Sequence, residues 1–368
     1  MPVMARTPHP AFLPPLLSVF LITLLFAAGA CGQEPAITAE MLAGWIKQYP
    51  DADTDKDGVL TEAEARAYYV KLQAAKEAAA KVPPPTQADV SYGPDKRQVL
   101  DFWRAPAEKP TALVVYIHGG GFVSGDKSAI RSMKLVPQCL GVGVSVASIN
   151  YRYLSPTVPL QDVLRDTARA LQFLRAHAAE FNIDKTRLAA CGHSAGAGSS
   201  LWLAFHDDLI DPQSTDPVLR ESSRLAAAVS WDGQFTYDLP GWAKYFGEDN
   251  RQKFGGIYNS PGIYGLATPE ELDGPEGRQR RAACDFYAMI SPDDPPVYLG
   301  SGLPTADITD VNQYLHNPRH SQLLYDRCRE QGVTTVAKIP ALKILPSPND
   351  PPYGESFLLK HLAAKSTP

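Results

Sequence analysis

The chain has 368 residues, of which 35 are Lys or Arg and 40 are Asp or Glu, so that its formal net charge is −5. The basic residues form no stripe or cluster, which argues against nucleic acid as a partner. Hydrophobic residues make up 44% of the sequence, as expected for a chain with a packed core. This length accommodates one large domain of about 270 residues and a small appendage.

Residues 1–30 have the pattern of a secretory signal peptide. Arg6 precedes an apolar run over 11–30 that ends in small residues. An uncleaved membrane anchor is the alternative, although two prolines interrupt the run. Residues 28–30 (Ala-Gly-Ala) fit a signal-peptidase site, and together with Cys31 they also resemble a bacterial lipobox. We therefore expect an exported protein that is periplasmic, secreted, or tethered to the cell envelope through a lipidated Cys31.

The next segment, residues 31–80, contains a twelve-residue acidic loop between two expected helices at 38–49 and 62–80. The loop, residues 53–64, resembles an EF-hand, because acidic residues occupy positions 1, 3, 5 and 12 and a glycine occupies position 6. The resemblance implies a calcium ion held by Asp53, Asp55, Asp57, the carbonyl of Val59, and Glu64.

A solvated acidic turn is the alternative interpretation of this loop. EF-hands usually pair, and the sequence contains no second loop of this kind. In an exported protein that meets millimolar calcium, the ion is expected to be a structural clamp rather than a sensor, with Leu60 packed between the flanking helices. A protein that acts mainly by calcium-dependent interaction is a further hypothesis. Residues 81–90, with three successive prolines, are expected to form a stiff linker.

Residues 91–365 contain several short apolar runs, and a segment with helical periodicity lies between two of them. In residues 164–179 the apolar side chains recur at helical spacing, as in a crossover helix that packs on a sheet. This alternation predicts an α/β fold with a mostly parallel sheet flanked by helices. The expected strands lie at 112–117, 144–149, 187–191, 225–231, 296–299 and 334–339.

Two glycine-rich motifs follow apolar runs in this region. Residues 118–122 read HGGGF and follow the run 112–117, while residues 192–196 read GHSAG and follow the run 187–191. Ser194 lies at the centre of the second motif, in the pattern of a nucleophile elbow whose strained turn exposes a hydroxyl. Glycines in the first motif let backbone N–H groups hydrogen-bond an oxyanion.

Together the two motifs resemble the α/β-hydrolase esterases and lipases, specifically the hormone-sensitive-lipase-like and feruloyl-esterase-like carboxylesterases. The resemblance covers about residues 92–362. It implies an α/β-hydrolase fold and a small-molecule ester substrate that acylates Ser194. It also implies an oxyanion hole formed by the N–H groups of Gly120, Gly121 and Ala195.

The resemblance implies that a carboxylate and then a histidine follow Ser194 along the chain. We expect the acid after the strand at 296–299. Asp307 is the first choice, Asp310 the second, and Asp232, which follows the preceding strand, is a further candidate.

The histidine departs from the family pattern. The loop at 342–353, where the family places its base, contains none. His361 falls in an expected helix, where a surface role is favoured. His316 and His320 remain, and His316 is our choice for the base, although a helix-capping or surface role is favoured at least as strongly for both.

Residues 234–289 are too long for a plain connection and are rich in aromatic residues. By resemblance they form a lid over the serine, and the alternative is a satellite core that only packs. Apart from Cys31 the chain has four cysteines, without a CxxC pair, so no zinc or redox site is indicated. The four cysteines can form two disulfides in three different ways. If any disulfide forms, we expect it between Cys284 and Cys328.

Two hypotheses for function follow. The first is an exported serine carboxylester hydrolase with a calcium-binding EF-hand and no cofactor for catalysis. The second is a degenerate α/β-hydrolase domain that binds an acyl or carbohydrate ligand without turnover. The elbow and the glycine loop favour the first, whereas the displaced histidine favours the second.

Overall fold

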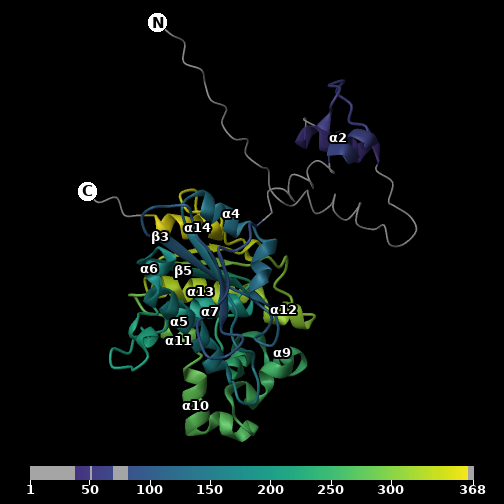
Figure 1. Ribbon diagram of the computed structural model, residues 1–368. Coiled ribbons are helices and arrows are strands. Elements are labelled where there is room, and N and C mark those ends of the chain that lie inside the picture. Colours follow the sequence, from purple (N-terminus) through teal and green to yellow (C-terminus); the bar gives the residue numbers. More distant parts are fainter. Residues whose placement is uncertain (1–37, 50–51, 69–81, 364–368) are drawn as a thin grey trace. The chain divides into compact units, whose positions relative to one another are not determined.

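The computed structural model describes residues 38–49, 52–68 and 82–363 (Figure 1). The expected signal peptide, Cys31 and most of the second EF-hand helix lie outside these residues. The chain divides into two compact units, Met1–Ala79 and Ala80–Pro368, which are considered separately below.

The larger unit is built on an eight-stranded sheet with the order β1-β2-β4-β3-β5-β6-β7-β8. The strands β1 and β2 pair antiparallel, β2 pairs antiparallel with β4, and all other neighbours are parallel. The expected mostly parallel α/β sheet is therefore confirmed. The strands are β1 (Gln87–Ser91), β2 (Val99–Trp103), β3 (Thr111–Ile117), β4 (Ser145–Ile149), β5 (Ile183–His193), β6 (Ala227–Trp231), β7 (Val297–Gly300) and β8 (Thr335–Lys338).

Helices cover both faces of the sheet, because alternate side chains of its central strands enter two different cores. Leu113, Val115 and Ile117 of β3 pack on the side of α5, α7 and α13, whereas Val114 and Tyr116 pack on the side of α4 and α14. Figure 1 shows these two groups of helices on either side of β3 and β5. The covering helices are α4 (Leu135–Gly141), α5 (Leu160–Ala176), α6 (Ala178–Phe181), α7 (Ala195–Phe205), α13 (Pro318–Glu330) and α14 (Gly354–Leu362), with the 3₁₀ helix η2 (Lys127–Ser132) before α4 and η3 (Pro217–Arg220) before β6.

The insertion between β6 and β7 consists of short helices without a strand. Its aromatic side chains form a cluster in which the ring of Phe235 contacts Trp242, Phe246 and Tyr287. These side chains belong to the same core as the side chains on the α5, α7 and α13 side of the sheet, so the insertion does not form a separate satellite core. Its elements are η4 (Leu239–Trp242), α8 (Ala243–Phe246), α9 (Glu248–Phe254), η5 (Gly256–Asn259), η6 (Pro261–Tyr264), η7 (Pro269–Asp273), α10 (Pro275–Ala282) and α11 (Phe286–Met289).

The linker expected at 81–90 is shorter than predicted. Its last four residues belong to β1, which begins at Gln87. Before β1, the carbonyl of Pro83 accepts a hydrogen bond from Trp103 Nε1 at 2.7 Å, and Thr86 Oγ1 accepts one from the N–H of Arg104 at 2.9 Å. These bonds hold the proline-rich segment against β2.

The four cysteines of the described chain, Cys139, Cys191, Cys284 and Cys328, are all free and buried. The pairing of Cys284 with Cys328 is therefore not formed. Burial raises the pKa of Cys139 to about 12, so this thiol packs as a small apolar group.

The smaller unit has a helix, α2 (Ala39–Gln48), an acidic loop, and helical residues 62–68. Thr38 begins α2 by accepting a hydrogen bond from the N–H of Met41. Leu60 is buried with Ala52 and Ala65, so its expected packing is confirmed. Within the described ranges, no helix is long and apolar enough to cross a membrane.

Candidate active site and metal site

Ser194 lies at the turn between β5 and α7. Its backbone has φ 52° and ψ −118°, a conformation that costs an L-residue about 1–3 kcal/mol. A Cβ atom at Gly192 would lie 2.4 Å from the carbonyl oxygen of Ile117, and one at Gly196 would lie 2.0 Å from the same oxygen. Both glycines are therefore needed for the elbow to approach β3, and the turn presents the serine hydroxyl at the carboxyl end of the sheet.

His316 places an imidazole beside this hydroxyl. Its Nε2 atom lies 2.8 Å from Ser194 Oγ, within the distance that proton transfer requires. His316 directly follows α12 (Val311–Leu315), in the connection between β7 and α13. The histidine therefore reaches the serine from one strand earlier than the family pattern implies.

Asn312 holds the other nitrogen of this imidazole. His316 Nδ1 lies 2.9 Å from Asn312 Oδ1 and 3.2 Å from the carbonyl oxygen of the same residue. The two residues are four positions apart, Asn312 in the first turn of α12 and His316 at its C-cap, so one helical turn brings them together. An Nδ1–H that donates to Asn312 leaves the Nε2 lone pair facing Ser194, as a general base needs. Sequence reasoning did not identify Asn312.

The structure does not bring the expected acid, Asp307, to the imidazole. Its Oδ2 atom accepts a hydrogen bond from Thr305 Oγ1 at 2.8 Å. The second choice, Asp310, caps α12 and accepts from the N–H of Gln313 at 2.8 Å. Both carboxylates are held by neighbours in their own loop, so Asn312 takes the position of the third member of the relay.

Asp232 is the carboxylate whose charge acts on His316. It follows β6 with φ 52°, and its Oδ1 accepts from the N–H of Gly302 at 2.7 Å. Burial lowers the pKa of His316 below 6.5, while the charge of Asp232 and the hydrogen bond to Asn312 oppose this shift. The imidazole is therefore mainly neutral at pH 7, the form that can accept a proton from serine.

The glycine loop, residues 118–122, lies beside Ser194. Gly120 and Gly121 have φ values of 112° and 60°, which favour glycine. Among the described residues, none accepts a hydrogen bond from the N–H of Gly120, Gly121 or Ala195. A hydrogen bond holds the start of this loop in place, since Tyr151 Oη donates to the carbonyl oxygen of His118 at 2.8 Å. These unpaired N–H groups can stabilise an oxyanion on a substrate bound at Ser194.

Ser194 opens into a small chamber of about 20 Å³. This volume holds little more than one water-sized group. The insertion supplies much of its wall, with Tyr237, Trp242 and Tyr258 among the lining residues. The chamber is lined by Gly121, Phe122, Ser194, Ala195, Gln234, Tyr237, Leu239, Trp242, Tyr258 and Leu315.

The other downstream histidines have structural surroundings. His320 is fully buried in α13, where Nδ1 accepts from the N–H of Phe235 and Nε2 lies 3.1 Å from the carbonyl of Tyr314. Burial lowers its pKa to about 3. His361 lies in α14 with its ring against Phe357. Of the candidate bases, the structure brings only His316 to the serine.

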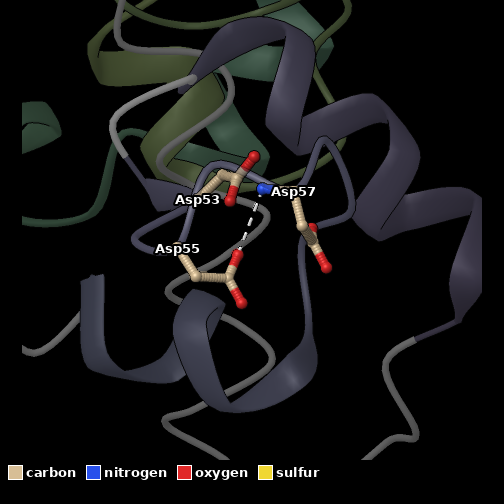
Figure 2. A group of neighbouring side chains, drawn as sticks. All are labelled: Asp53, Asp55 and Asp57. Carbon is tan, nitrogen blue, oxygen red and sulfur yellow. Dashed lines mark hydrogen bonds between the residues drawn. The ribbon is translucent and has the colours of Figure 1, made fainter.

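In the smaller unit, one carboxylate oxygen from each of Asp53, Asp55 and Asp57 lies within 4.8 Å of the other two (Figure 2). Asp53 Oδ1 is buried and has no hydrogen-bond partner. Its other oxygen accepts from the N–H of Gly58, whose φ of 83° makes the sharp turn expected of an EF-hand glycine. An unpaired buried carboxylate oxygen beside two further carboxylates fits a hard cation such as Ca²⁺.

The remaining expected ligands are arranged differently. Glu64 is not gathered with the three aspartates. Its carboxylate accepts hydrogen bonds from the N–H and hydroxyl groups of Thr61 and Thr54, which lower its pKa to about 2. Val59 donates its N–H to Asp57 Oδ1, and no described residue donates to its carbonyl oxygen.

Comparisons with known proteins agree with this fold. The family model described as BD-FAE matches residues 100–252, which include the glycine loop and the elbow but not His316. The most similar solved structures include a truncated carbohydrate esterase from gut microbiota, with a TM-score of 0.54, 16% identity, and coverage of 77% of this chain and 100% of that chain. An acetyl ester-xyloside bifunctional hydrolase from Caldicellulosiruptor lactoaceticus has a TM-score of 0.50, 19% identity, and coverage of 70% and 86%. The larger unit has the α/β-hydrolase fold.

Curated relatives of the chain are named as ester hydrolases. A probable carboxylic ester hydrolase of Mycobacterium tuberculosis is 31% identical over 40% of this chain and 35% of its own length. An acetyl esterase of Salmonella choleraesuis is 28% identical over 54% of this chain and 56% of its own length. The chain spans about a third to just over a half of the length of these relatives.

Proposed function

We propose that this protein is a serine carboxylester hydrolase. The observation that carries the proposal is the 2.8 Å contact between His316 Nε2 and Ser194 Oγ, at an elbow that faces three unpaired N–H groups. The names of the curated relatives support the same reaction class. A domain that only bound its ligand would not need a strained serine in contact with a neutral imidazole.

The reaction follows from these positions. Ser194 Oγ attacks the ester carbonyl carbon while His316 Nε2 takes the hydroxyl proton. The N–H groups of Gly120, Gly121 and Ala195 stabilise the oxyanion of the tetrahedral intermediate. When the intermediate collapses, the bond to the alcohol oxygen breaks, the alcohol leaves with the proton from His316, and an acyl-Ser194 remains. Water then attacks this acyl group by the same route and releases the acid.

Treatment with a fluorophosphonate tests this proposal. The expected result is one phosphonyl group per chain, attached to Ser194, with parallel loss of activity on p-nitrophenyl acetate. Mass spectrometry of the digested protein locates the adduct, and Ser194→Ala serves as the unlabelled control. Labelling elsewhere with Ser194 unmodified, or no labelling of active protein, would overturn the proposal.

We also propose that the N-terminal loop binds one calcium ion through Asp53, Asp55 and Asp57, with Glu64 and the Val59 carbonyl as further ligands. The unpartnered Asp53 Oδ1 supports this assignment. In the described arrangement Glu64 is bonded to threonines, so it would have to exchange these bonds for the ion. A single loop of this kind is expected to bind with a Kd of about 10⁻⁴ M.

Calcium titration of the chelator-treated full chain measures this site. Asp55 is exposed and accepts one hydrogen bond, from the N–H of Asp57, so Asp55→Ala removes a ligand with little other change. We expect calcium binding at least about tenfold weaker in this variant. The matched control is Asp207→Ala, an exposed aspartate of the larger unit, which should bind like wild type. Equal binding in both variants would remove the loop as the calcium site.

We propose that the protein is exported, and that it remains attached to the cell envelope if Cys31 is lipidated. The support is the N-terminal sequence alone, with Arg6, the apolar run 11–30 and the small residues before Cys31. The N-terminal mass of the protein recovered from an envelope fraction checks this. An N-terminus at residue 1 in a cytosolic fraction would contradict it.

A further inference from the structure

A second and much larger cavity adjoins the serine chamber. Its volume is about 590 Å³, within the range of pockets that hold small molecules. None of its lining residues is charged, and most are apolar. Its walls include Val123 of the glycine loop, Leu154, and Ile257 and Ile263 of the insertion.

Two chain segments form walls of both cavities. In the glycine loop, Gly121 and Phe122 line the serine chamber, whereas Val123 lines the larger cavity. In the insertion, Tyr258 lines the chamber, whereas its neighbour Ile257 lines the larger cavity. The two spaces therefore lie next to each other along the glycine loop and residues 257–258, beside the oxyanion hole.

Tyr258 lies where the two spaces meet. Its hydroxyl donates to the carbonyl oxygen of Gly121 at 3.3 Å. The contact is so close that a Cβ atom at Gly121 would lie 2.4 Å from the tyrosine oxygen. Tyr258 also lines the chamber beside Ser194, which leaves only about 20 Å³ there.

We propose that the larger cavity holds the alcohol portion of the ester substrate and that Tyr258 restricts the acyl portion to a short chain. The substrate class is then a short-chain acyl ester of an uncharged, mainly apolar alcohol of about the size of an aromatic ring system. A charged alcohol would lose its hydration in this cavity without an ionic partner. This inference rests on the proposed ester hydrolysis at Ser194.

The alcohol side is tested with ethyl acetate and 2-naphthylmethyl acetate, whose alcohols have similar acidity and different size. Wild type should have a kcat/KM at least about tenfold higher for the naphthylmethyl ester. Ile257 is 52% exposed, so Ile257→Asp should fold, and it should reduce this preference about tenfold. Ile210, which is 43% exposed and outside the cavity, gives the matched control Ile210→Asp, with the wild-type preference.

The acyl side is tested with p-nitrophenyl acetate and p-nitrophenyl hexanoate. Tyr258→Ala should raise the hexanoate-to-acetate ratio of kcat/KM at least about tenfold, because it removes the ring from the chamber. Tyr258→Phe keeps the ring and should keep the wild-type ratio. An unchanged ratio in Tyr258→Ala would refute the role of Tyr258.

These outcomes separate the inference from the proposed function. If wild type hydrolyses none of the four esters, ester hydrolysis itself fails. If it hydrolyses them in a Ser194-dependent manner but Ile257→Asp and Ile210→Asp keep the same alcohol preference, the assignment of the cavity is wrong and ester hydrolysis stands.

Discussion

His316→Ala should lower kcat on p-nitrophenyl acetate by at least about 10³-fold. His316 is the described side chain that is hydrogen-bonded to Ser194 Oγ. Without its imidazole, the hydroxyl proton can pass only to solvent water, and the hydroxyl is a poor nucleophile at neutral pH. The oxyanion N–H groups remain, so a small residual rate is expected. Steady-state kinetics with thermal unfolding as a check on folding measures the effect.

His361→Ala is the matched control for this variant. His361 lies in α14 against Phe357, in the helix that follows the loop where the family places its base. Its substitution should leave kcat within about twofold of wild type, since surface substitutions away from a site have small effects. A rate lost in His361→Ala and kept in His316→Ala would reverse the assignment of the base.

Two substitutions of Asn312 should separate orientation of the base from its charge. Asn312→Ala removes the acceptor of the His316 Nδ1 proton and should lower kcat about 10- to 100-fold, the size expected for loss of one hydrogen bond to the imidazolium that forms during the reaction. Asn312→Asp keeps an acceptor there and adds a negative charge. That charge favours imidazolium and raises the pKa of His316.

The pH dependence of kcat/KM distinguishes these effects. Activity requires neutral His316, so it falls as the pH drops through the pKa of this group. Burial lowers that pKa, which puts the acidic limb of the wild-type profile below pH 6.5. In Asn312→Asp the limb should move to higher pH. If both variants keep the wild-type rate and profile, Asn312 does not position the base.

The fold could be predicted because its elements carry strong local patterns. The apolar runs at 112–117 and 144–149 correspond to β3 and β4, and the periodic segment at 164–179 overlaps α5. The elbow could also be predicted from a short motif. Gly192 and Gly196 are required there because their backbone lies close to that of Ile117 in β3. In contrast, β1 was included in the linker because its five residues, Gln87–Ser91, are mostly exposed and lack an apolar run.

The relay could be predicted only in part. His316 remained a candidate by counting the histidines that follow Ser194, but the sequence did not distinguish it from His320. The third member was sought among carboxylates, and Asp307 was chosen by its place after β7. A signal was present in the spacing of Asn312 and His316, because residues four apart share a helix face. The spacing has this meaning only if residues 311–315 form a helix. The five residues of α12 have no clear apolar periodicity, so the sequence did not indicate this helix.

Hydrolysis of p-nitrophenyl acetate by wild type and Ser194→Ala, measured side by side at pH 7.5, tests the central claim most directly. The Ser194–His316 contact predicts turnover by wild type and a loss of at least about 10³-fold in kcat for Ser194→Ala. Equal rates in the two proteins, or no turnover by folded wild type, would contradict a serine ester hydrolase.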